Sequence, residues 1–436
     1  MISNKITTGL NGNPIIPGDK SISHRSVIIP AISKGTSEIK NILKSEDVLH
    51  TLKAFEKMGV KIEQFDDKIL IHGNGLNSLN KPNSDIYLGN SGTSARLLIG
   101  LLASQNFDST LTGDESLSKR PMGRIAEPLK KMNAKIQTTN GSLPLQIYKS
   151  KLNNAEIDIK IPSAQIKSGL ILAALNTDGI TKITEHNITR DHTEIMLKDF
   201  GANISFTKEG SKKIIKIIGK KELESNNINV PSDLSSSAFF IVAGLIHKNS
   251  KLILNNININ PTRNGILIAL KKMGAKINYF NKRKINSEQV CDIEVVSSEL
   301  NGCNLDGDIA KLMIDEYPII AVAASFANSP SIFRGLEELR VKESDRLELI
   351  KINLLNCGVE CKVENDDLII NPSKNFQIKN NNIITNYDHR IAMAFAVMAS
   401  KIGLLKIKDG ESINTSFPSF ITEFNKIGGN INWIKK

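Results

Sequence analysis

Hydrophobic and polar positions follow one another along this chain in a pattern that returns six times. Each copy closes with an apolar residue, a glycine or its substitute, a small residue, a polar residue and another apolar residue, as in Met58-Gly59-Val60-Lys61-Ile62. The second position of this signature is filled by Gly59, Asn133, Gly201, Gly274, Gly358 and Gly428. Because an amphipathic run precedes every copy, the signature predicts the end of a helix followed by a strand. A long repeat of this kind indicates a supersecondary unit that buries its apolar face against its own copies.

A second pattern recurs in step with the first, in which a small or polar opening leads into an almost wholly apolar run. The openings contain Ser, Asp or Asn, which cap helices, and the runs are apolar on every side, so they predict buried helices. The six runs contain Val27–Ile29, Leu97–Ile99, Leu170–Leu172, Phe239–Ile241, Ile319–Ala321 and Ala394–Ala396. Each repeat therefore predicts a strand, a buried helix, a strand, an amphipathic helix and further strands. The expected fold class is α/β.

The two ends of the chain predict how the repeats are grouped. Only eight residues, Gly429 to Lys436, follow the sixth signature glycine, so the sixth repeat lacks chain, while the segment before the first buried helix contains the strand-like Ile15-Ile16. We therefore expect the N-terminal segment to complete the sixth repeat. This predicts a three-repeat domain at 17–231 and a discontinuous three-repeat domain at 1–16 and 232–436. Pro17 and Pro231 would stiffen the two crossings between the domains.

Length and composition favour a protein with two globular domains. The chain has 436 residues, of which 40% are hydrophobic, and no apolar run approaches the ~20 residues of a membrane span. No signal or transit pattern is visible, so we expect a cytoplasmic protein without a membrane partner. The four cysteines (Cys291, Cys303, Cys357, Cys361) show no zinc spacing and are expected to be buried reduced thiols. The seven histidines form no metal motif.

The net charge of +11 favours anionic partners without naming them. Lys, Asn and Ile are all abundant, and much of the excess lysine is expected to be a solvated surface, as at Lys271-Lys272. Aromatic residues make up 5% of the chain and do not alternate with the basic clusters. A stacking surface for nucleic acid is therefore not supported.

Charged and hydrogen-bonding residues gather at the openings of the predicted buried helices. A helix N-terminus offers unpaired N–H groups and the positive end of a dipole, and Arg or Lys beside it would complete a site for a polyanion. Taken singly, each arginine is more commonly a member of a surface ion pair, but five helix openings with such groups in register favour a ligand site. The openings hold Lys20, Ser21 and Arg25; Asn90, Gly92, Thr93 and Arg96; Ser163, Gln165 and Lys167; Asp315 and Glu316; Asp388, His389 and Arg390. Two further basic segments lie at 119–124 and 340–346.

Five of these segments resemble one enzyme family, the EPSP synthases (3-phosphoshikimate 1-carboxyvinyltransferases). The matching segments are 17–25, 88–93, 120–123, 340–346 and 387–390, and they follow one another along the entire chain. The resemblance implies a two-domain inverse α/β fold with six βαβαββ repeats, three in each domain, and an active site in the interdomain cleft. It implies transfer of the enolpyruvyl group of phosphoenolpyruvate (PEP) to the 5-hydroxyl of shikimate 3-phosphate, with release of phosphate, in the pathway to chorismate and the aromatic amino acids. No cofactor and no metal are implied, and a monomer is expected.

The resemblance also assigns roles to residues of this chain. Asp315 would accept a proton, Glu343 would donate one, and Lys20 would contact both substrates. The residues implied for shikimate 3-phosphate are Lys20, Ser21, Arg25, Ser163, Ala164, Gln165, Arg190, Asp315 and Lys342. Those implied for PEP are Lys20, Gly92, Arg120, Gln165, Arg346 and Arg390. The 17–231 domain would thus carry the half-site with Lys20, Gly92, Arg120 and Gln165, and the other domain the half-site with Asp315, Glu343, Arg346 and Arg390.

Segments 163–167 and 189–194 resemble the branch of the family called class II, and the C-terminal Thr415 stands where the best-known enteric form has lysine. Glyphosate occupies the PEP site in this family. The class II resemblance is associated with insensitivity, whereas Gly92 leaves space for the inhibitor. Because steric room is the more direct cue, we expect inhibition competitive with PEP.

Two other functions fit parts of the sequence. A UDP-N-acetylglucosamine enolpyruvyl transferase shares the fold and the PEP chemistry, but that family usually has a reactive Cys in the loop that ends in Arg-Pro, and Glu115 to Pro121 contains none. A basic RNA-binding or RNA-end-processing repeat protein would bind with strong salt dependence, whereas a small-ligand pocket would be competed by phosphate.

Overall fold

A computed structural model describes residues 1–210, 212–403 and 405–434, which divide into two compact units. The first, here the N-terminal unit, consists of Lys20–Val230 together with Ile285–Glu288. The second, the C-terminal unit, consists of Met1–Asp19, Pro231–Lys284 and Gln289–Lys436. Residues 17–19 and 231 thus belong to the C-terminal unit, and 285–288 to the N-terminal one. Each unit has a separate hydrophobic core.

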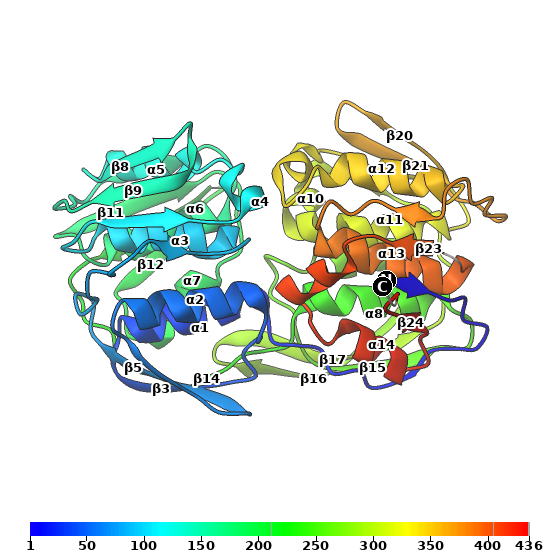
Figure 1. The fold of residues 1–436 in the computed structure, drawn as a ribbon, viewed down its shortest axis with the longest axis horizontal. Helices are drawn as coiled ribbons and strands as arrows, with labels where there is room; N and C mark the ends of the chain where they lie inside the picture. Colours follow the sequence, from blue (N-terminus) through cyan, green and yellow to red (C-terminus); the bar gives the residue numbers. More distant parts are fainter. Residues whose placement is uncertain (211, 404, 435–436) are drawn as a thin grey trace. The chain divides into compact units, whose positions relative to one another are not determined.

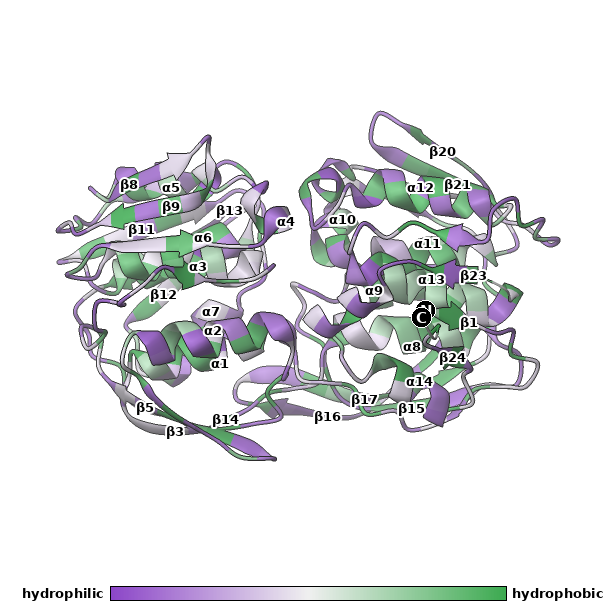
Figure 2. Ribbon diagram, in the orientation of Figure 1, coloured by the Kyte–Doolittle hydropathy of each residue, from purple (hydrophilic) through white to green (hydrophobic). Residues whose placement is uncertain are grey.

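The predicted buried helices are present in all six repeats (Figure 1). Their apolar residues are enclosed on every side; in α8 all thirteen residues are buried, and Figure 2 shows this helix largely in the colours of hydrophobic residues. Ser91, Ser163, Asp233 and Asp388 cap four of these helices with side-chain oxygens, as their sequence positions suggest. The six are α1 (Lys20–Ala31), α3 (Gly92–Ala103), α6 (Ala164–Ala174), α8 (Leu234–Ile246), α11 (Tyr317–Ser325) and α13 (His389–Ile402).

The predicted amphipathic helices are present as well, and each ends at the repeated signature. They are α2 (Glu46–Lys57), α5 (Gly123–Lys130), α7 (His192–Asp199), α9 (Gly265–Lys272), α12 (Arg346–Asn356) and α14 (Phe420–Lys426). The second signature residue has a positive φ in every repeat: 85° at Gly59, 71° at Asn133, 82° at Gly201, 84° at Gly274, 81° at Gly358 and 104° at Gly428. Glycine adopts this conformation without strain and asparagine tolerates it, which explains why the signature admits these two residues.

Six four-stranded sheets among the described residues share one topology, in which the first two strands are parallel and the remaining pairs are antiparallel. In the N-terminal unit the orders are β14 (Ile228–Asn229)-β3 (Lys34–Lys40)-β5 (Lys68–Asn74)-β4 (Lys61–Gln64), β6 (Ile86–Tyr87)-β7 (Ser109–Thr112)-β9 (Ser142–Tyr148)-β8 (Lys135–Thr139), and β10 (Glu156–Ile159)-β11 (Ile180–Glu185)-β13 (Lys212–Ile218)-β12 (Ile204–Glu209). The sheets of the C-terminal unit follow the same scheme. Their orders are β2 (Asn11–Gly12)-β15 (Lys251–Asn258)-β17 (Glu288–Val296)-β16 (Lys276–Ile285), β18 (Asn304–Leu305)-β19 (Ser331–Phe333)-β21 (Asp367–Asn371)-β20 (Glu360–Glu364), and β22 (Asn382–Ile383)-β23 (Leu405–Ile407)-β1 (Ile2–Ser3)-β24 (Ile431–Asn432).

The N-terminal segment completes the sixth sheet, as the sequence predicted. Strand β1 lies between β23 and β24 and is antiparallel to both, with Ile2 opposite Lys406 on one side and Asn432 on the other. Strand β2 adds to the fourth sheet in parallel with β15. The first ten residues thus supply to the last repeat the strand that its own chain lacks.

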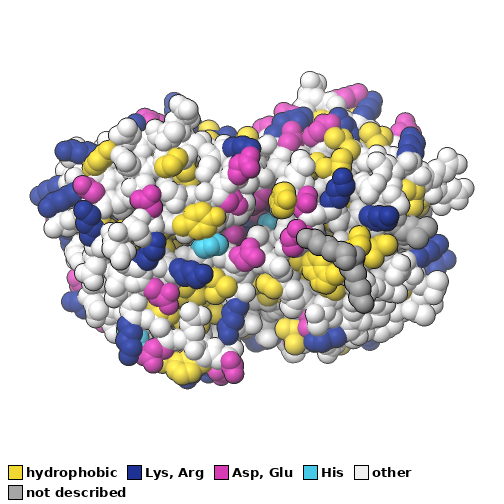
Figure 3. Space-filling model, in the orientation of Figure 1, with side chains coloured by type: hydrophobic (Ala, Val, Ile, Leu, Met, Phe, Trp, Pro, Cys, Tyr) yellow, Lys and Arg dark blue, Asp and Glu magenta, His cyan; other side chains and the backbone are white. Residues whose placement is uncertain are grey.

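Shorter elements connect the repeats: α4 (Glu115–Ser118), α10 (Gly307–Met313) and the 3₁₀ turns η1 (Ile314–Glu316), η2 (Glu337–Val341) and η3 (Gly410–Thr415). All four cysteines are free, and Cys303 is only partly buried, contrary to the expectation that all would be buried. Among the described residues no helix combines the length and the apolar character needed to cross a bilayer. Figure 3 shows Lys and Arg mixed with Asp and Glu over the visible face.

Candidate active site

Lys20 opens helix α1 and lies beside an acidic residue of the neighbouring helix α2. Its Nζ is 2.5 Å from Oδ2 of Asp47, which is buried. The ion pair holds the ammonium group at the start of α1, where the helix dipole also favours anions. Sequence reasoning did not select Asp47, because an acidic residue in the first turn of a helix is common for stability alone.

Gly92 lies close to two guanidinium groups at the start of α3. A Cβ atom built at Gly92 would be 2.9 Å from Nη1 of Arg96 and 3.1 Å from Nη1 of Arg120. Arg96 donates to the Gln165 side-chain oxygen at 2.6 Å, and Arg120 donates to the side chain of Asn90. These amide oxygens are neutral acceptors, which a phosphate or carboxylate oxygen can replace with a stronger charge-assisted bond. Arg96, although noted at its helix opening, was not among the assigned ligand residues.

The start of α6 and the segment before α7 hold the other candidates of the N-terminal unit. Ser163 caps α6 by accepting a hydrogen bond from the Ile166 N–H at 3.4 Å, and Ala164 and Gln165 form the first turn of that helix. Arg25 is buried, with its guanidinium directed to α6 and α7. Arg190 lies two residues before α7 and is partly exposed.

Lys167, also in the first turn of α6, is paired within the protein. Its ammonium group is fully buried, 3.0 Å from Glu185 and 2.9 Å from Glu194, and donates to the Thr189 carbonyl at 3.2 Å. Burial by itself would lower the pKa of Lys167, but the two carboxylates raise it above its ordinary value. Burial also raises the pKa of Glu185. This ion-pair network anchors the residue before Arg190.

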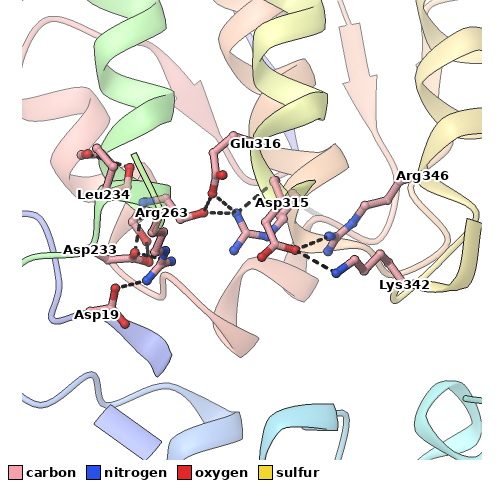
Figure 4. Close-up of polar contacts among 12 residues, drawn as sticks. Asp19, Asp233, Leu234, Arg263, Asp315, Glu316, Lys342 and Arg346 are labelled. Carbon is pink, nitrogen blue, oxygen red and sulfur yellow. Dashed lines mark hydrogen bonds and ion pairs between the residues drawn. The ribbon is translucent and has the colours of Figure 1, made fainter. Parts of the chain in front are cut away.

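In the C-terminal unit Asp315 faces two cations (Figure 4). Its Oδ1 lies 3.2 Å from Nη1 of Arg346 and 3.6 Å from Nζ of Lys342. Asp315 belongs to the turn before α11, whereas Lys342 and Arg346 come from the segment that leads into α12. The repeat structure thus brings together residues that are about thirty positions apart.

Arg346 is the centre of this half-site. Its guanidinium is fully buried and contacts Glu343 Oε2 at 2.5 Å and Asp388 Oδ2 at 2.8 Å in addition to Asp315. Burial alone would lower its pKa, but the carboxylates of Asp388, Glu343 and Asp315 raise it above the ordinary value. Arg346 is therefore a permanent cation shared by three carboxylates. Asp388, the cap of α13, is a contact that sequence reasoning did not assign.

Arg390 belongs to the same half-site, because it contacts residues at the start of α8 and just before α11. Its Nη1 donates to Ser235 Oγ at 2.5 Å and to the Asp315 carbonyl at 3.3 Å, and it lies 3.7 Å from Glu316 Oε1. Figure 4 shows the adjoining buried group, in which Arg263 contacts both Asp19 and Asp233. Arg263 therefore ties the residue before Lys20 to the cap of α8.

The fold defines the class of protein. The enolpyruvyl transferase NikO of Streptomyces tendae shares the architecture with a TM-score of 0.78 over 99% of this chain and 97% of that chain, at 15% identity, which concerns the fold alone. An EPSP synthase structure from Acinetobacter baumannii matches with a TM-score of 0.85 and 41% identity, covering 98% of both chains.

Sequence comparison identifies the family within this class. The model of the family "EPSP synthase (3-phosphoshikimate 1-carboxyvinyltransferase)" matches residues 5–424. A 3-phosphoshikimate 1-carboxyvinyltransferase of Ruthia magnifica subsp. Calyptogena magnifica is 45% identical over 99% of this chain and 98% of its own length. A 3-phosphoshikimate 1-carboxyvinyltransferase of Bacillus cereus (strain G9842) is 41% identical over 97% of this chain and 98% of its own length. The chain belongs to the EPSP synthase family.

The protein is accordingly an enolpyruvyl transferase of the shikimate pathway, with the inverse α/β fold of its family. It transfers the enolpyruvyl group of PEP to shikimate 3-phosphate. This family assignment decides against the UDP-N-acetylglucosamine enolpyruvyl transferase as the function of the chain.

Proposed function

We propose that the enzyme performs this transfer by general acid–base catalysis, with Asp315 as proton acceptor and Glu343 as proton donor. The observation that carries the proposal is that both carboxylates contact one guanidinium: Asp315 at 3.2 Å from Arg346 Nη1 and Glu343 at 2.5 Å from Arg346 Nη2. One buried cation thus holds two carboxylates side by side. Asp315 can accept the hydroxyl proton in its ionised form, and Glu343 must be protonated before it can deliver a proton to PEP.

The steps follow from addition and elimination at PEP. The 5-hydroxyl oxygen of shikimate 3-phosphate bonds to C2 of PEP as its proton passes to Asp315, and the methylene carbon takes a proton from Glu343. The resulting methyl group then returns a proton to Glu343, the bond from C2 to the phosphate oxygen breaks, and phosphate leaves with the proton that Asp315 had accepted. Lys20 contacts both substrates and stabilises the anionic oxygens during these steps.

Two sets of residues would bind the substrates. PEP carries a phosphate and a carboxylate, which match the cations beside Gly92 and at the start of α13. We assign to PEP Lys20, Gly92, Arg120, Gln165, Arg346 and Arg390. We assign to shikimate 3-phosphate Lys20, Ser21, Arg25, Ser163, Ala164, Gln165, Arg190, Asp315 and Lys342. Thr415 is left out, because it stands where the best-known enteric form has lysine; its hydroxyl contacts His389 at 3.2 Å and the Ser412 carbonyl at 2.8 Å.

Phosphate release tests the substrate assignment on which the proposed acid–base roles rest. We expect release from PEP only when shikimate 3-phosphate is present, with no release when shikimate or UDP-N-acetylglucosamine replaces it. Shikimate is the matched control because it has the acceptor hydroxyl but lacks the phosphate that Ser163 and the basic residues would bind. Release with UDP-N-acetylglucosamine and none with shikimate 3-phosphate would overturn the proposal.

The proposal extends to the working state of the enzyme. It acts as a cytoplasmic monomer on small molecules, without nucleic acid, membrane, metal or organic cofactor. The described residues contain no group of three His, Cys, Asp or Glu arranged to hold a metal ion. Light scattering after gel filtration and assays with chelator test this state; a dimer, or activity lost to chelation, would contradict it.

A further inference from the structure

The Arg25 guanidinium is fixed by hydroxyl groups from two other helices. Its Nε donates to Thr193 Oγ1 at 2.6 Å, its Nη2 donates to Ser168 Oγ at 2.7 Å, and its Nη1 donates to the Ser21 carbonyl at 2.7 Å. At least three of the five N–H groups of the arginine are thereby committed to oxygens with fixed positions. These contacts set both the plane and the direction of the guanidinium.

The two hydroxyls are themselves held in one orientation. Thr193 donates to Ser168 at 2.7 Å, and Ser168 donates to the Ala164 carbonyl at 2.6 Å. Each hydroxyl has one hydrogen to donate and two lone pairs to accept, so Thr193 accepts from Arg25 while Ser168 accepts from both Arg25 and Thr193. The hydrogen bonds form a single consistent chain. Both hydroxyl residues are buried, at 0% exposure for Ser168 and 1% for Thr193.

This chain joins the three places where the 3-phosphate is proposed to bind. Arg25 and Ser21 are on α1, Ser168 lies one turn after Ala164 on α6, and Thr193 follows Arg190 by three residues at the start of α7. The Arg25–Thr193 and Arg25–Ser168 contacts join residues 168 and 143 positions apart, so only the folded unit assembles them.

We infer that Thr193 and Ser168 are positioning residues that hold Arg25 ready for shikimate 3-phosphate and thereby set the affinity for this substrate. The inference rests on the proposed role of Arg25. An arginine held in its binding geometry loses less side-chain freedom when the ligand arrives, so its contacts contribute more to affinity. This positioning function accounts for Thr193, which lies in the class II segment 189–194 but takes no direct part in the proposed reaction.

The test compares variants that differ in one hydroxyl. Thr193→Val keeps nearly the same shape without the hydroxyl, and Thr193→Ser keeps the hydroxyl. We expect Thr193→Val and Ser168→Ala each to raise the KM for shikimate 3-phosphate about 3- to 30-fold, with kcat and the KM for PEP within about twofold. Thr193→Ser should restore the KM. Thr181→Val is the control, since its hydroxyl is also buried and contacts Thr177 at 3.3 Å in the same unit, yet it should leave every KM unchanged.

A second comparison separates positioning from stability. In an Arg25→Gln background Thr193→Val should add little to the KM for shikimate 3-phosphate, since there is no guanidinium left to hold. An equal effect in both backgrounds, or a lowered melting temperature with an unchanged KM, would overturn the inference. If Arg25→Gln itself leaves this KM unchanged, the proposed role of Arg25 fails instead. Should Thr193→Val not fold, Ser168→Ala and the same Arg25→Gln background decide the question.

Discussion

At the scale of single residues, the sequence does not distinguish a cation that is paired within the protein from one that is accessible to a ligand. Lys167 and Lys20 both stand at openings of buried helices. Lys167 is fully enclosed between Glu185 and Glu194, whereas Lys20 has one carboxylate partner, Asp47, and its side chain remains 16% exposed. Lys167, balanced by two carboxylates of its own unit and enclosed by them, stabilises the fold, whereas the exposed part of Lys20 leaves its ammonium group accessible to a ligand.

The proton-transfer assignment leads to the first prediction. Glu343→Gln and Asp315→Asn keep the size of each side chain and remove its ability to exchange a proton, so each should lower kcat about 10²–10⁴-fold. Thermal unfolding should change less than turnover, because both side chains are partly exposed and each variant leaves the buried Arg346 with two of its three carboxylate partners. Glu360→Gln, at an exposed position of β20, is the matched control and should have normal kcat. Near-normal turnover in Glu343→Gln would remove Glu343 as the proton donor.

The second prediction concerns the close approach of Gly92 to Arg96 and Arg120. A methyl group there would lie 2.9 Å and 3.1 Å from their Nη1 atoms, so both guanidinium tips would have to shift. We expect Gly92→Ala to raise the inhibition constant of glyphosate, which is longer than PEP, by a larger factor than the KM for PEP. Gly123→Ala is the control, since a Cβ there meets nothing within 4 Å.

Inhibition assays at several PEP concentrations measure both constants. Competitive inhibition of the unmodified enzyme is the expected pattern. Equal glyphosate inhibition constants for the unmodified enzyme and for Gly92→Ala would show that Gly92 does not determine the sensitivity to glyphosate.

At the scale of elements, each amphipathic helix is followed within three residues by a residue of positive φ, which lies between helix and strand in all six repeats. The atoms that surround this second signature residue differ from one repeat to another. A Cβ at Gly59 would lie 2.3 Å from the Asn80 side chain, whereas one at Gly201 would meet nothing within 4 Å. The common requirement is thus the backbone conformation and not a shortage of space.

Gly201 allows this requirement to be measured. Gly201→Ala adds no contact but places an L-residue at a φ of 82°, so it should lower the free energy of unfolding by about 1 kcal/mol. Gly201→Asn should cost less, because asparagine tolerates this conformation and occupies it at Asn133. Denaturant unfolding followed by circular dichroism provides the values. An alanine variant as stable as the unmodified protein would mean that the conformation is not required there.

At the scale of the whole molecule, the proposed ligand groups are divided between the two compact units. The chain passes from one to the other at Asp19–Lys20 and at Val230–Pro231, and residues 285–288 of the β16–β17 hairpin belong to the N-terminal unit. Since the groups proposed for shikimate 3-phosphate include Lys20 and Arg25 of one unit and Asp315 and Lys342 of the other, we predict that saturation with this substrate lowers the radius of gyration.

Small-angle X-ray scattering tests this expectation. Saturating shikimate 3-phosphate should reduce the radius of gyration, and shikimate with inorganic phosphate at the same concentrations is the control for unlinked anion binding. An unchanged radius at saturation, with binding shown independently by calorimetry, would contradict the shared site.

Much of the fold could be predicted because its determinants are local. The apolar runs, their capping residues and the signature glycines each predict one element, and their sixfold recurrence predicts the repeat. Even the strand supplied by the N-terminus followed from counting what the sixth repeat lacks, and β1 confirms it. Most candidate site residues could also be assigned from the sequence, because each motif that resembles the family is a short continuous segment.

Charge pairing was decided only by the tertiary structure. Nothing local distinguishes Lys167 from Lys20, predicts that Asp388 and Asp315 share Arg346 with Glu343, or links Arg25 to hydroxyls 168 and 143 residues away. Burial and electrostatic pairing depend on which surfaces pack together, and these surfaces come from different repeats. The sequence by itself determined which elements form and how often they recur, whereas packing determined which charged groups are neutralised within the protein and which are suited to a ligand.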